Sequence, residues 1–222
     1  MNIVDPRIEE YMRGVLSPAD PVRSEMERLG AERKFPIIGP LVGNLCALMA
    51  RTIGARKVFE MGSGFGYSTL WFARAVGAGG LVVHTEGSEE NSRLARDFLT
   101  RAGVADRVRF EVGDAREIID REIAGGANLP FDIVFNDIDK EQYPDVLPRA
   151  RKALRAGGLL ICDNMIWSGR VLEPSPQDDT TRGILELTRQ LKQAEDFITT
   201  LVPIRDGVTV SFRVKQGAEK LP

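Results

Sequence analysis

The sequence predicts an α/β fold with a doubly wound, seven-stranded sheet that is mostly parallel and ends in an antiparallel hairpin. Three observations predict this fold. Short apolar runs alternate with helical patterns from about residue 55 onward. A glycine-rich turn follows the first apolar run, an arrangement typical of the ligand-binding edge of such sheets. An Asp-Gly pair separates the last two apolar runs, and that pair favours a tight turn between antiparallel strands.

The elements follow from this alternation. Residues 1–53 are expected to form two or three helices, broken at Ser17-Pro18 and at Gly39-Pro40, that pack over the ligand side of the sheet. Five apolar runs then predict buried strands at 57–61, 80–85, 107–112, 131–136 and 157–162. Helical patterns are found near 66–76, 88–101, 115–124, 141–154 and 180–195. The last two strands are expected at 197–204 and 208–215, on either side of Arg205-Asp206-Gly207.

Composition predicts a single domain over 1–222 with an N-terminal helical cap at about 1–53, because 222 residues with 43% hydrophobic content suit one well-buried core. A net charge of −2 argues against a nucleic-acid partner. No apolar run approaches the roughly 20 residues of a membrane span, and Met1 to Arg13 lacks the apolar core of a signal peptide. Cys46 and Cys162 are expected to be buried small residues, which suits a cytoplasmic location.

The glycine-rich turn runs from Glu60 to Ser68 and indicates the cofactor. A dinucleotide fingerprint has the spacing Gly-x-Gly-x-x-Gly, whereas here the glycines are Gly62, Gly64 and Gly66. An acid at Glu60 would repel a pyrophosphate but could accept a hydrogen bond from an ammonium group. The pattern therefore favours S-adenosylmethionine (SAM), which carries an amino acid group and no phosphate. The alternative is a structural glycine turn without a ligand.

A second acid, Glu86, ends the strand predicted at 80–85 and strengthens this interpretation. Ligands of doubly wound sheets bind outside the carboxyl ends of the strands, where an acid about 20 residues past the glycine turn can accept hydrogen bonds from both ribose hydroxyls. Glu86 alone would more simply be a solvated strand-end glutamate. Its pairing with the glycine turn favours the cofactor role.

Polar side chains also end the fourth and fifth predicted strands. Asp137 follows one strand, and Asp163 and Asn164 follow the next. These residues are expected to converge, and an oxygen-only set with open positions suits Mg²⁺, Mn²⁺ or Ca²⁺ rather than zinc. The alternative is that Asp163 and Asn164 only cap the helix or turn that follows.

Lys140 comes three residues after Asp137 and is a candidate general base, because a neighbouring divalent cation disfavours the charged ammonium. The alternative is a surface lysine paired with Asp139 or Glu141. His84, the only histidine, is expected to be a packed strand residue. Its isolation argues against a Ser-His-Asp or Cys-His hydrolase.

Taken together, these motifs resemble the cation-dependent O-methyltransferases, the group that contains caffeoyl-CoA and catechol O-methyltransferases. The resemblance extends from about Phe35 to Arg213. It rests on the following segments: Gly39-Pro40-Leu41-Val42-Gly43, the Glu60–Ser68 turn, Thr85-Glu86, Val112-Gly113-Asp114-Ala115, Asp137-Ile138-Asp139-Lys140 with Tyr143, Asp163-Asn164 and Pro203-Ile204-Arg205-Asp206-Gly207. It implies the Rossmann-like fold of class I SAM-dependent methyltransferases.

The resemblance also implies roles for single residues. Asp137, Asp163 and Asn164 would hold the metal, and Lys140 matches the catalytic lysine of the catechol branch. The residues expected around SAM are Ile38, through its backbone, Glu60, Gly62, Ser63, Gly64, Ser68, Glu86, Ala115, Asp137 and Asp139. Two positions depart from the family pattern. Asn136 replaces a usually apolar residue, and Gly64 replaces a bulkier one.

The expected activity is transfer of a methyl group from SAM to one hydroxyl of a small aromatic diol, in a homodimeric enzyme. Residues 165–176 are expected to form a mobile lid, in which Trp167 either contacts the substrate or packs in the core. The alternatives are a non-catalytic SAM- or metal-binding module and an NAD-dependent oxidoreductase. A nucleic-acid N-methyltransferase would need an Asn/Asp-Pro-Pro-aromatic motif where this chain has Asn136-Asp137-Ile138-Asp139.

Overall fold

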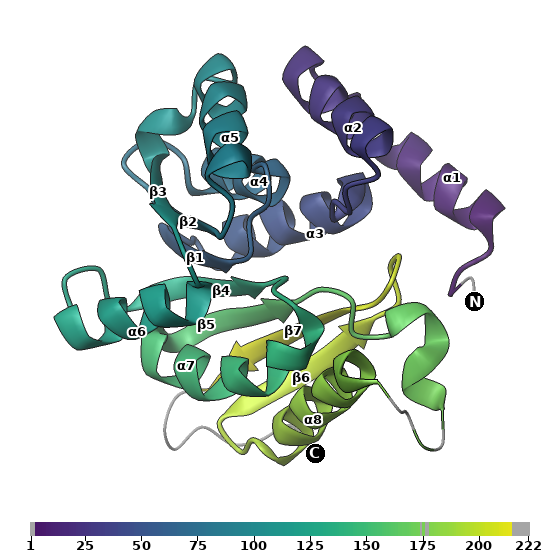
Figure 1. The fold of residues 1–222 in the computed structure, drawn as a ribbon, viewed down its shortest axis with the longest axis vertical. Coiled ribbons are helices and arrows are strands. Elements are labelled where there is room, and N and C mark those ends of the chain that lie inside the picture. The colour runs from purple at the N-terminus through teal and green to yellow at the C-terminus, as the bar shows by residue number, and fades with distance from the viewer. Residues whose placement is uncertain (1–2, 174, 176–177, 215–222) are drawn as a thin grey trace.

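The computed structural model describes residues 3–173, 175 and 178–214 and contains a seven-stranded sheet (Figure 1). The strand order is β3-β2-β1-β4-β5-β7-β6, so the chain starts in mid-sheet, moves outward to one edge and then builds the other half. In this described sheet β7 runs in the opposite direction to the other strands, so its pairs with β5 and β6 are antiparallel and all other pairs are parallel. The predicted fold class is therefore confirmed. The strands are β1 (Lys57–Met61), β2 (Leu81–Glu86), β3 (Val108–Val112), β4 (Phe131–Asn136), β5 (Leu154–Cys162), β6 (Phe197–Val202) and β7 (Val208–Arg213).

Helices cover both faces of the sheet (Figure 1). One face is covered by α3 (Gly39–Thr52), α4 (Tyr67–Val76) and α5 (Glu89–Arg101). The other face is covered by α6 (Ala115–Gly125), α7 (Val146–Ala153) and α8 (Asp179–Gln193). The remaining helices are α1 (Pro6–Val15), α2 (Pro21–Arg33) and three short three-ten helices, η1 (Ala105–Arg107), η2 (Lys140–Asp145) and η3 (Trp167–Leu172).

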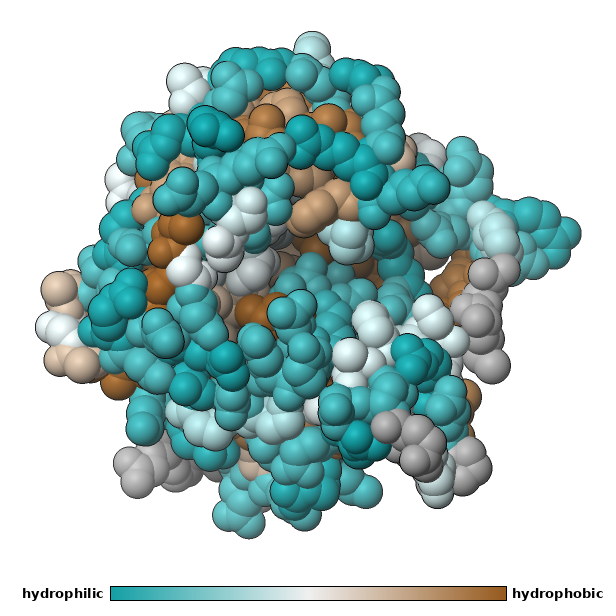
Figure 2. Space-filling model, viewed as in Figure 1, coloured by the Kyte–Doolittle hydropathy of each residue, from teal (hydrophilic) through white to brown (hydrophobic). Residues whose placement is uncertain are grey.

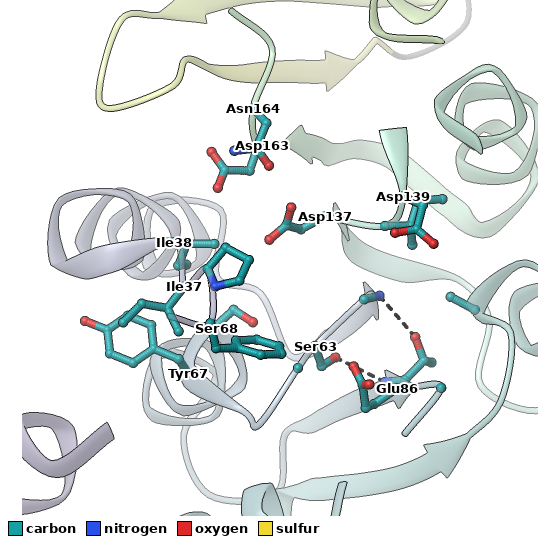
Figure 3. A pocket seen from close by; sticks show the side chains of 18 of the residues that line it. Ile37, Ile38, Ser63, Tyr67, Ser68, Glu86, Asp137, Asp139, Asp163 and Asn164 are labelled. Atoms are coloured by element: carbon teal, nitrogen blue, oxygen red, sulfur yellow. Dashed lines mark hydrogen bonds between the residues drawn. The ribbon is translucent and has the colours of Figure 1, made fainter. Parts of the chain in front are cut away.

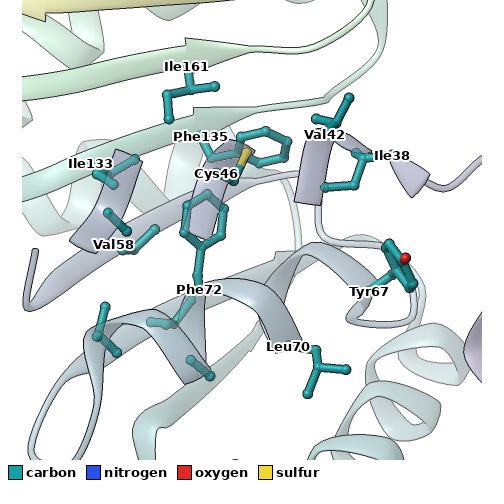
Figure 4. Close-up of a cluster of buried hydrophobic side chains, with 14 of the residues drawn as sticks. Ile38, Val42, Cys46, Val58, Tyr67, Leu70, Phe72, Ile133, Phe135 and Ile161 are labelled. Carbon is teal, nitrogen blue, oxygen red and sulfur yellow. The ribbon is translucent and has the colours of Figure 1, made fainter. Parts of the chain in front are cut away.

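Two hydrophobic cores result, because successive strand residues point to opposite faces. In β1, Val58 belongs to the core under α3 to α5, and Phe59 belongs to the core under α6 to α8. Figure 4 shows the first core, in which Cys46 of α3 lies among aromatic and aliphatic side chains. Cys46 and Cys162 are both fully buried and free, as the sequence predicted.

The N-terminal helices α1 and α2 each begin at a proline. Pro6 and Pro21 each start a helix after an aspartate cap, and Asp20 accepts hydrogen bonds from the backbone of Val22 and Arg23. The predicted break at Ser17-Pro18 is confirmed. The predicted break at Gly39-Pro40 is wrong by a few residues, because this pair starts α3 and the chain is irregular at 35–38. Proline needs no hydrogen-bond partner for its nitrogen in the first turn of a helix.

The helix predicted at 141–154 is also different in the structure. Residues 140–145 form the three-ten helix η2, which contains Pro144, and the α-helix α7 begins only at Val146. Proline inside an α-helix removes one backbone hydrogen bond and clashes with the preceding turn. The chain then enters β5 at Leu154, three residues earlier than predicted. The predicted end of the last strand, Lys215, lies outside the described residues.

Hydrophilic residues cover most of the face shown in Figure 2, and hydrophobic residues are visible mainly in its hollows. Across the described part of the chain, no helix combines the length and the apolar character needed to cross a bilayer.

Candidate active site

A cavity of about 810 Å³ opens at the carboxyl ends of the central strands (Figure 3). Its walls come from the segment before α3, the glycine-rich turn after β1, the ends of β2 and β3, and the segments after β4 and β5. This is the edge at which α/β sheets bind ligands. Twelve residues of the predicted site line this cavity: Ile38, Gly62, Ser63, Gly64, Ser68, Glu86, Ala115, Asp137, Asp139, Lys140, Asp163 and Asn164.

Glycine is required in the turn after β1 because other backbone and ring atoms approach it closely. Gly62 has a φ of 80°, and a Cβ atom there would lie 2.6 Å from the carbonyl oxygen of Asp137. At Gly64, a Cβ atom would lie 2.8 Å from the Phe35 ring. Phe35 therefore occupies the space that a bulkier residue at position 64 would need, which accounts for the second departure from the family pattern.

The helix α4 begins directly after this turn, and its N-terminus faces the cavity. Tyr67 and Ser68, its first residues, both line the cavity. The preceding residue, Gly66, provides no side-chain cap, so the first N–H groups of α4 have no side-chain acceptor. Free N–H groups and the positive end of the helix dipole attract a carboxylate or another anion.

Glu86 lies at the end of β2 on the opposite side of the cavity from Asp163 (Figure 3). Its Oε1 atom accepts hydrogen bonds from the backbone nitrogen of Ser88 at 3.0 Å and from Asn91 Nδ2 at 3.3 Å. Its Oε2 atom accepts none from the described part of the chain. One carboxylate oxygen thus fixes the side chain, and the other remains available to hydroxyl groups of a ligand.

Glu60 does not line the cavity, which differs from the direct contact expected for it. It is fully buried in β1, behind the wall formed by Ser63 and Ser68. Burial raises the pKa of Glu60 to about 7, although hydroxyl groups of Thr69, Ser68 and Ser63 act in the opposite direction. Its Oε1 atom has no hydrogen-bond partner among the described residues.

Two carboxylates and an amide meet at the other end of the cavity, as predicted from the strand ends (Figure 3). Asp163 is only 4% exposed, and its Oδ1 atom has no hydrogen-bond partner in the described structure. Burial and the nearby charge of Asp137 raise the pKa of Asp163 to about 7. Burial also raises the pKa of Asp137, against the effect of Lys140. A cation placed between these carboxylates would relieve both costs.

These residues fit a hard divalent cation by their oxygen chemistry. The described residues contain no group of three or more His, Cys, Asp or Glu side chains arranged to hold a metal ion. The predicted set has two carboxylates and the amide of Asn164, so oxygens of water or a ligand would have to complete the coordination. Of the capping alternative, the helix part is excluded, because the next helix in the described chain, η3, has no side-chain cap at its N-terminus. Asp163 does accept a local hydrogen bond from the backbone of Asn164.

Lys140 is directed into this acidic end of the cavity. Its Nζ atom donates to Asp137 Oδ1 at 2.8 Å and to the carbonyl oxygen of Ile138 at 3.1 Å. Its side chain is 13% exposed, and Nζ lies 5.4 Å from the Tyr143 ring centre and 5.8 Å from that of Trp167. In the described part of the chain Lys140 pairs with Asp137, not with Asp139 or Glu141 as in the alternative of a surface ion pair.

Arg205 and Asp206 also line the cavity, although the sequence assigned them no site role beyond the hairpin turn and the family resemblance. The turn between β6 and β7 reaches the cavity, and Arg205 Nη1 donates to the carbonyl oxygen of Ile37 at 2.5 Å. The backbone of Ile166 donates to the Asp206 carbonyl at 2.8 Å. This turn therefore holds both the segment before α3 and the segment after β5, where the lid was expected. Pro174 and Pro176 of that expected lid lie outside the described residues.

Comparisons with known proteins agree with this geometry. A family model described as O-methyltransferase matches residues 24–214. A catechol O-methyltransferase of Mycobacterium tuberculosis is 35% identical over 176 residues, which cover 78% of each chain.

Two solved structures share the fold over nearly the whole chain. The O-methyltransferase TomG of Streptomyces achromogenes, in complex with SAM, has a TM-score of 0.85 and 29% identity and covers 94% of this chain and 96% of its own. An O-methyltransferase of Bacillus cereus, in complex with SAH, has a TM-score of 0.85 and 30% identity and covers 94% of this chain and 97% of its own.

Proposed function

The chain belongs to the O-methyltransferase family, and from this premise we propose that it methylates one hydroxyl of a small vicinal aromatic diol with the help of a divalent cation. SAM is the methyl donor, in keeping with the family and with the SAM- and SAH-bound relatives. One observation carries the finer proposal. The same cavity is lined by Glu86, which has one carboxylate oxygen available to a ligand, and by Asp163, whose Oδ1 atom has no hydrogen-bond partner in the described structure. Lys140 also lines this cavity and donates to Asp137.

The cofactor end of the cavity suits the parts of SAM. Glu86 Oε2 accepts hydrogen bonds from the ribose hydroxyls, since Oε1 is already engaged with Ser88 and Asn91. The N-terminus of α4, with Ser68, binds the carboxylate of the amino acid group. Glu60 lies behind the wall at the same end, where it would complement the ammonium and sulfonium groups of SAM in its carboxylate form.

The acidic end suits the acceptor. Asp137, Asp163 and Asn164 would hold the cation, which when bound lowers the pKa of a hydroxyl that it contacts. Lys140 accepts the hydroxyl proton. Arg205 is another cationic residue on the cavity wall, but a guanidinium cannot accept a proton near neutral pH. Positioning of the acceptor oxygen against the methyl group supplies the remaining rate enhancement.

A panel of aromatic acceptors tests the proposal. Purified protein is incubated with SAM, Mg²⁺ and catechols that differ in ring substituents, and the products are separated by regiochemistry. Phenols with a single hydroxyl are the matched controls and are expected to react far more slowly. Equal rates for catechols and single phenols would contradict the vicinal-diol proposal. SAM binding without methylation of any acceptor would favour the non-catalytic module.

Replacement of Glu86 by alanine is expected to weaken SAM binding by about 1–3 kcal/mol, the usual cost of losing hydrogen bonds to a charged group. Calorimetry with SAH measures this effect without turnover. Glu89→Ala is the control, because Glu89 is an exposed residue in the first turn of α5. Tighter binding of NADH than of SAM by the unmodified protein would instead favour the oxidoreductase.

We also propose that the protein is a homodimer. In the described sheet, β6 is an edge strand, and Leu201 on β6 and Phe212 on β7 are 48% and 39% exposed. Natural proteins cover or pair such edges because an open edge invites aggregation. Light scattering at micromolar concentration is expected to give the mass of two chains, and Leu201→Lys is expected to shift this mass toward one chain. A monomer in the unmodified protein refutes the proposal.

A further inference from the structure

Three polar side chains form a hydrogen-bonded row behind the cofactor end of the cavity. They are Glu60 of β1, Thr69 of α4 and His84 of β2, and all three are fully buried. Thr69 Oγ1 lies 2.5 Å from Glu60 Oε2 and 3.1 Å from His84 Nδ1. His84 Nε2 and Glu60 Oε1, the outer atoms of the row, have no partner in the described structure. The function proposed above assigns no role to Thr69 or His84.

The row admits two hydrogen-bond arrangements, because the Thr69 hydroxyl has one proton to donate. Burial lowers the pKa of His84 to about 3, so its ring is neutral and carries one N–H. If that proton is on Nδ1, His84 donates to Thr69, and Thr69 donates to an ionised Glu60. If it is on Nε2, Thr69 must donate to His84, and a protonated Glu60 must donate to Thr69. The two arrangements differ by the charge of Glu60.

The groups around Glu60 leave these arrangements finely balanced. The hydroxyls of Thr69, Ser68 and Ser63 favour the carboxylate, whereas burial and the charge of Asp137, which follows β4, oppose it. From α3, Cys46 is a neutral thiol, because burial raises its pKa well above the ordinary value. On the outer side of His84, Arg96 of α5 lies over the Phe110 ring that His84 contacts. A hydrogen-bond donor on His84 is therefore sufficient to select between the two hydrogen-bond arrangements, and with them the charge of Glu60.

We propose that His84 is a positioning residue for the cofactor: its Nδ1–H donates to Thr69, which fixes the Thr69 hydroxyl toward Glu60 and keeps Glu60 a carboxylate behind the SAM site. This inference rests on the proposed function, because the cationic groups of SAM are what the carboxylate serves. Ser63 and Ser68, which line the cavity and contact Glu60, transmit its position to the ligand.

The tautomer can be measured directly, because His84 is the only histidine in the sequence. Nitrogen NMR of untagged protein with labelled histidine is expected to show a neutral ring protonated at Nδ1 and unchanged between about pH 5.5 and 8.5. An Nε2–H tautomer or an imidazolium would overturn the inference. This outcome is independent of whether the protein binds SAM.

SAM binding across the pH range is the second measurement. Thr69→Val removes the hydroxyl, and we expect SAM affinity to fall about tenfold at pH 7. His84→Phe keeps a ring against Phe110 but removes the donor, and the affinity is expected to fall severalfold at pH 7 and to return to the wild-type value near pH 9. The direction of this pH dependence follows from the charge of Glu60. Without the His84 donor, the pKa of Glu60 is expected to be higher, so Glu60 is protonated at neutral pH and SAM affinity is reduced there. At higher pH Glu60 ionises and the affinity returns.

Conservative variants separate positioning from packing. Thr69→Ser retains the hydroxyl and His84→Gln retains an N–H donor, so both are expected to restore the pH profile of binding in large part. Thr188→Val on α8 is the control for loss of a threonine hydroxyl away from the row, since Thr188 is exposed and its hydroxyl donates to the carbonyl oxygen of Ile184. Equal loss at every pH in His84→Phe would indicate packing alone and contradict the inference. Failure of the unmodified protein to bind SAM would contradict the proposed function instead.

Discussion

Replacement of Lys140 by alanine is expected to lower kcat by about 10²–10⁴, the usual contribution of a positioned acid–base group. SAM affinity is expected to remain nearly unchanged, because Lys140 contacts Asp137, Ile138 and two aromatic rings at the acceptor end of the cavity. The loss of rate is expected to shrink for acceptors with more acidic hydroxyls, since a hydroxyl that is already ionised needs no proton acceptor. Steady-state kinetics over catechols of graded acidity measure all three effects.

Two further variants define the role of Lys140. Lys140→Arg keeps the positive charge beside Asp137 but is not expected to restore activity, since the guanidinium stays protonated. Lys192→Ala in the last turn of α8 is the control for loss of a lysine outside the cavity. If kcat of Lys140→Ala stays within a few-fold of wild type for every acceptor, Lys140 only neutralises Asp137.

Replacement of Asp163 by alanine is expected to reduce kcat by more than about a hundredfold, because even residues outside the coordination sphere of a metal typically cost 10- to 100-fold. The same loss is expected when EDTA is added to the unmodified protein, with recovery on addition of Mg²⁺ or Mn²⁺. Binding of Mn²⁺, followed by electron paramagnetic resonance, is expected to weaken in parallel. This readout does not depend on turnover.

Asp106→Ala is the matched control for Asp163, because the Asp106 side chain is 71% exposed and lies away from the cavity. It is expected to leave both Mn²⁺ binding and kcat unchanged. Full activity of Asp163→Ala in the presence of EDTA would show that the acidic cluster has no cation-dependent role in catalysis.

The sequence predicted the meeting of Asp137 with Asp163 and Asn164 for a topological reason. Parallel strands direct their carboxyl ends to one edge, so polar residues directly after β4 and β5 must converge once those strands are neighbours. The glycine-rich turn was predicted from its place after an apolar strand, and the structure explains Gly62 by its close contact with the backbone of Asp137. The local sequence pattern and the sheet topology were together sufficient to predict that these residues lie at the cavity.

The contact of the Asp206-Gly207 turn with the cavity and the direction of the Glu60 side chain depend on tertiary packing, which the local sequence pattern does not predict. Asp206-Gly207 predicts a turn, but its contact with the cavity follows from the insertion of β7 between β5 and β6. Glu60 was predicted to contact the cofactor, yet its side chain is directed into the buried row with Thr69. The helix predicted at 141–154 conflicts with Pro144, because a proline inside an α-helix interrupts its hydrogen bonds.

The position of β7 between β5 and β6 determines how chains that stop before β7 are expected to behave. The cofactor end of the cavity is built mainly from residues before 116, whereas Arg205 and Asp206 come much later in the chain. A product that stops before β7 leaves the apolar strand β5 as an open edge, and β6 then has no partner through which to join the sheet. Open apolar edges pair with other chains, so such products are expected to aggregate.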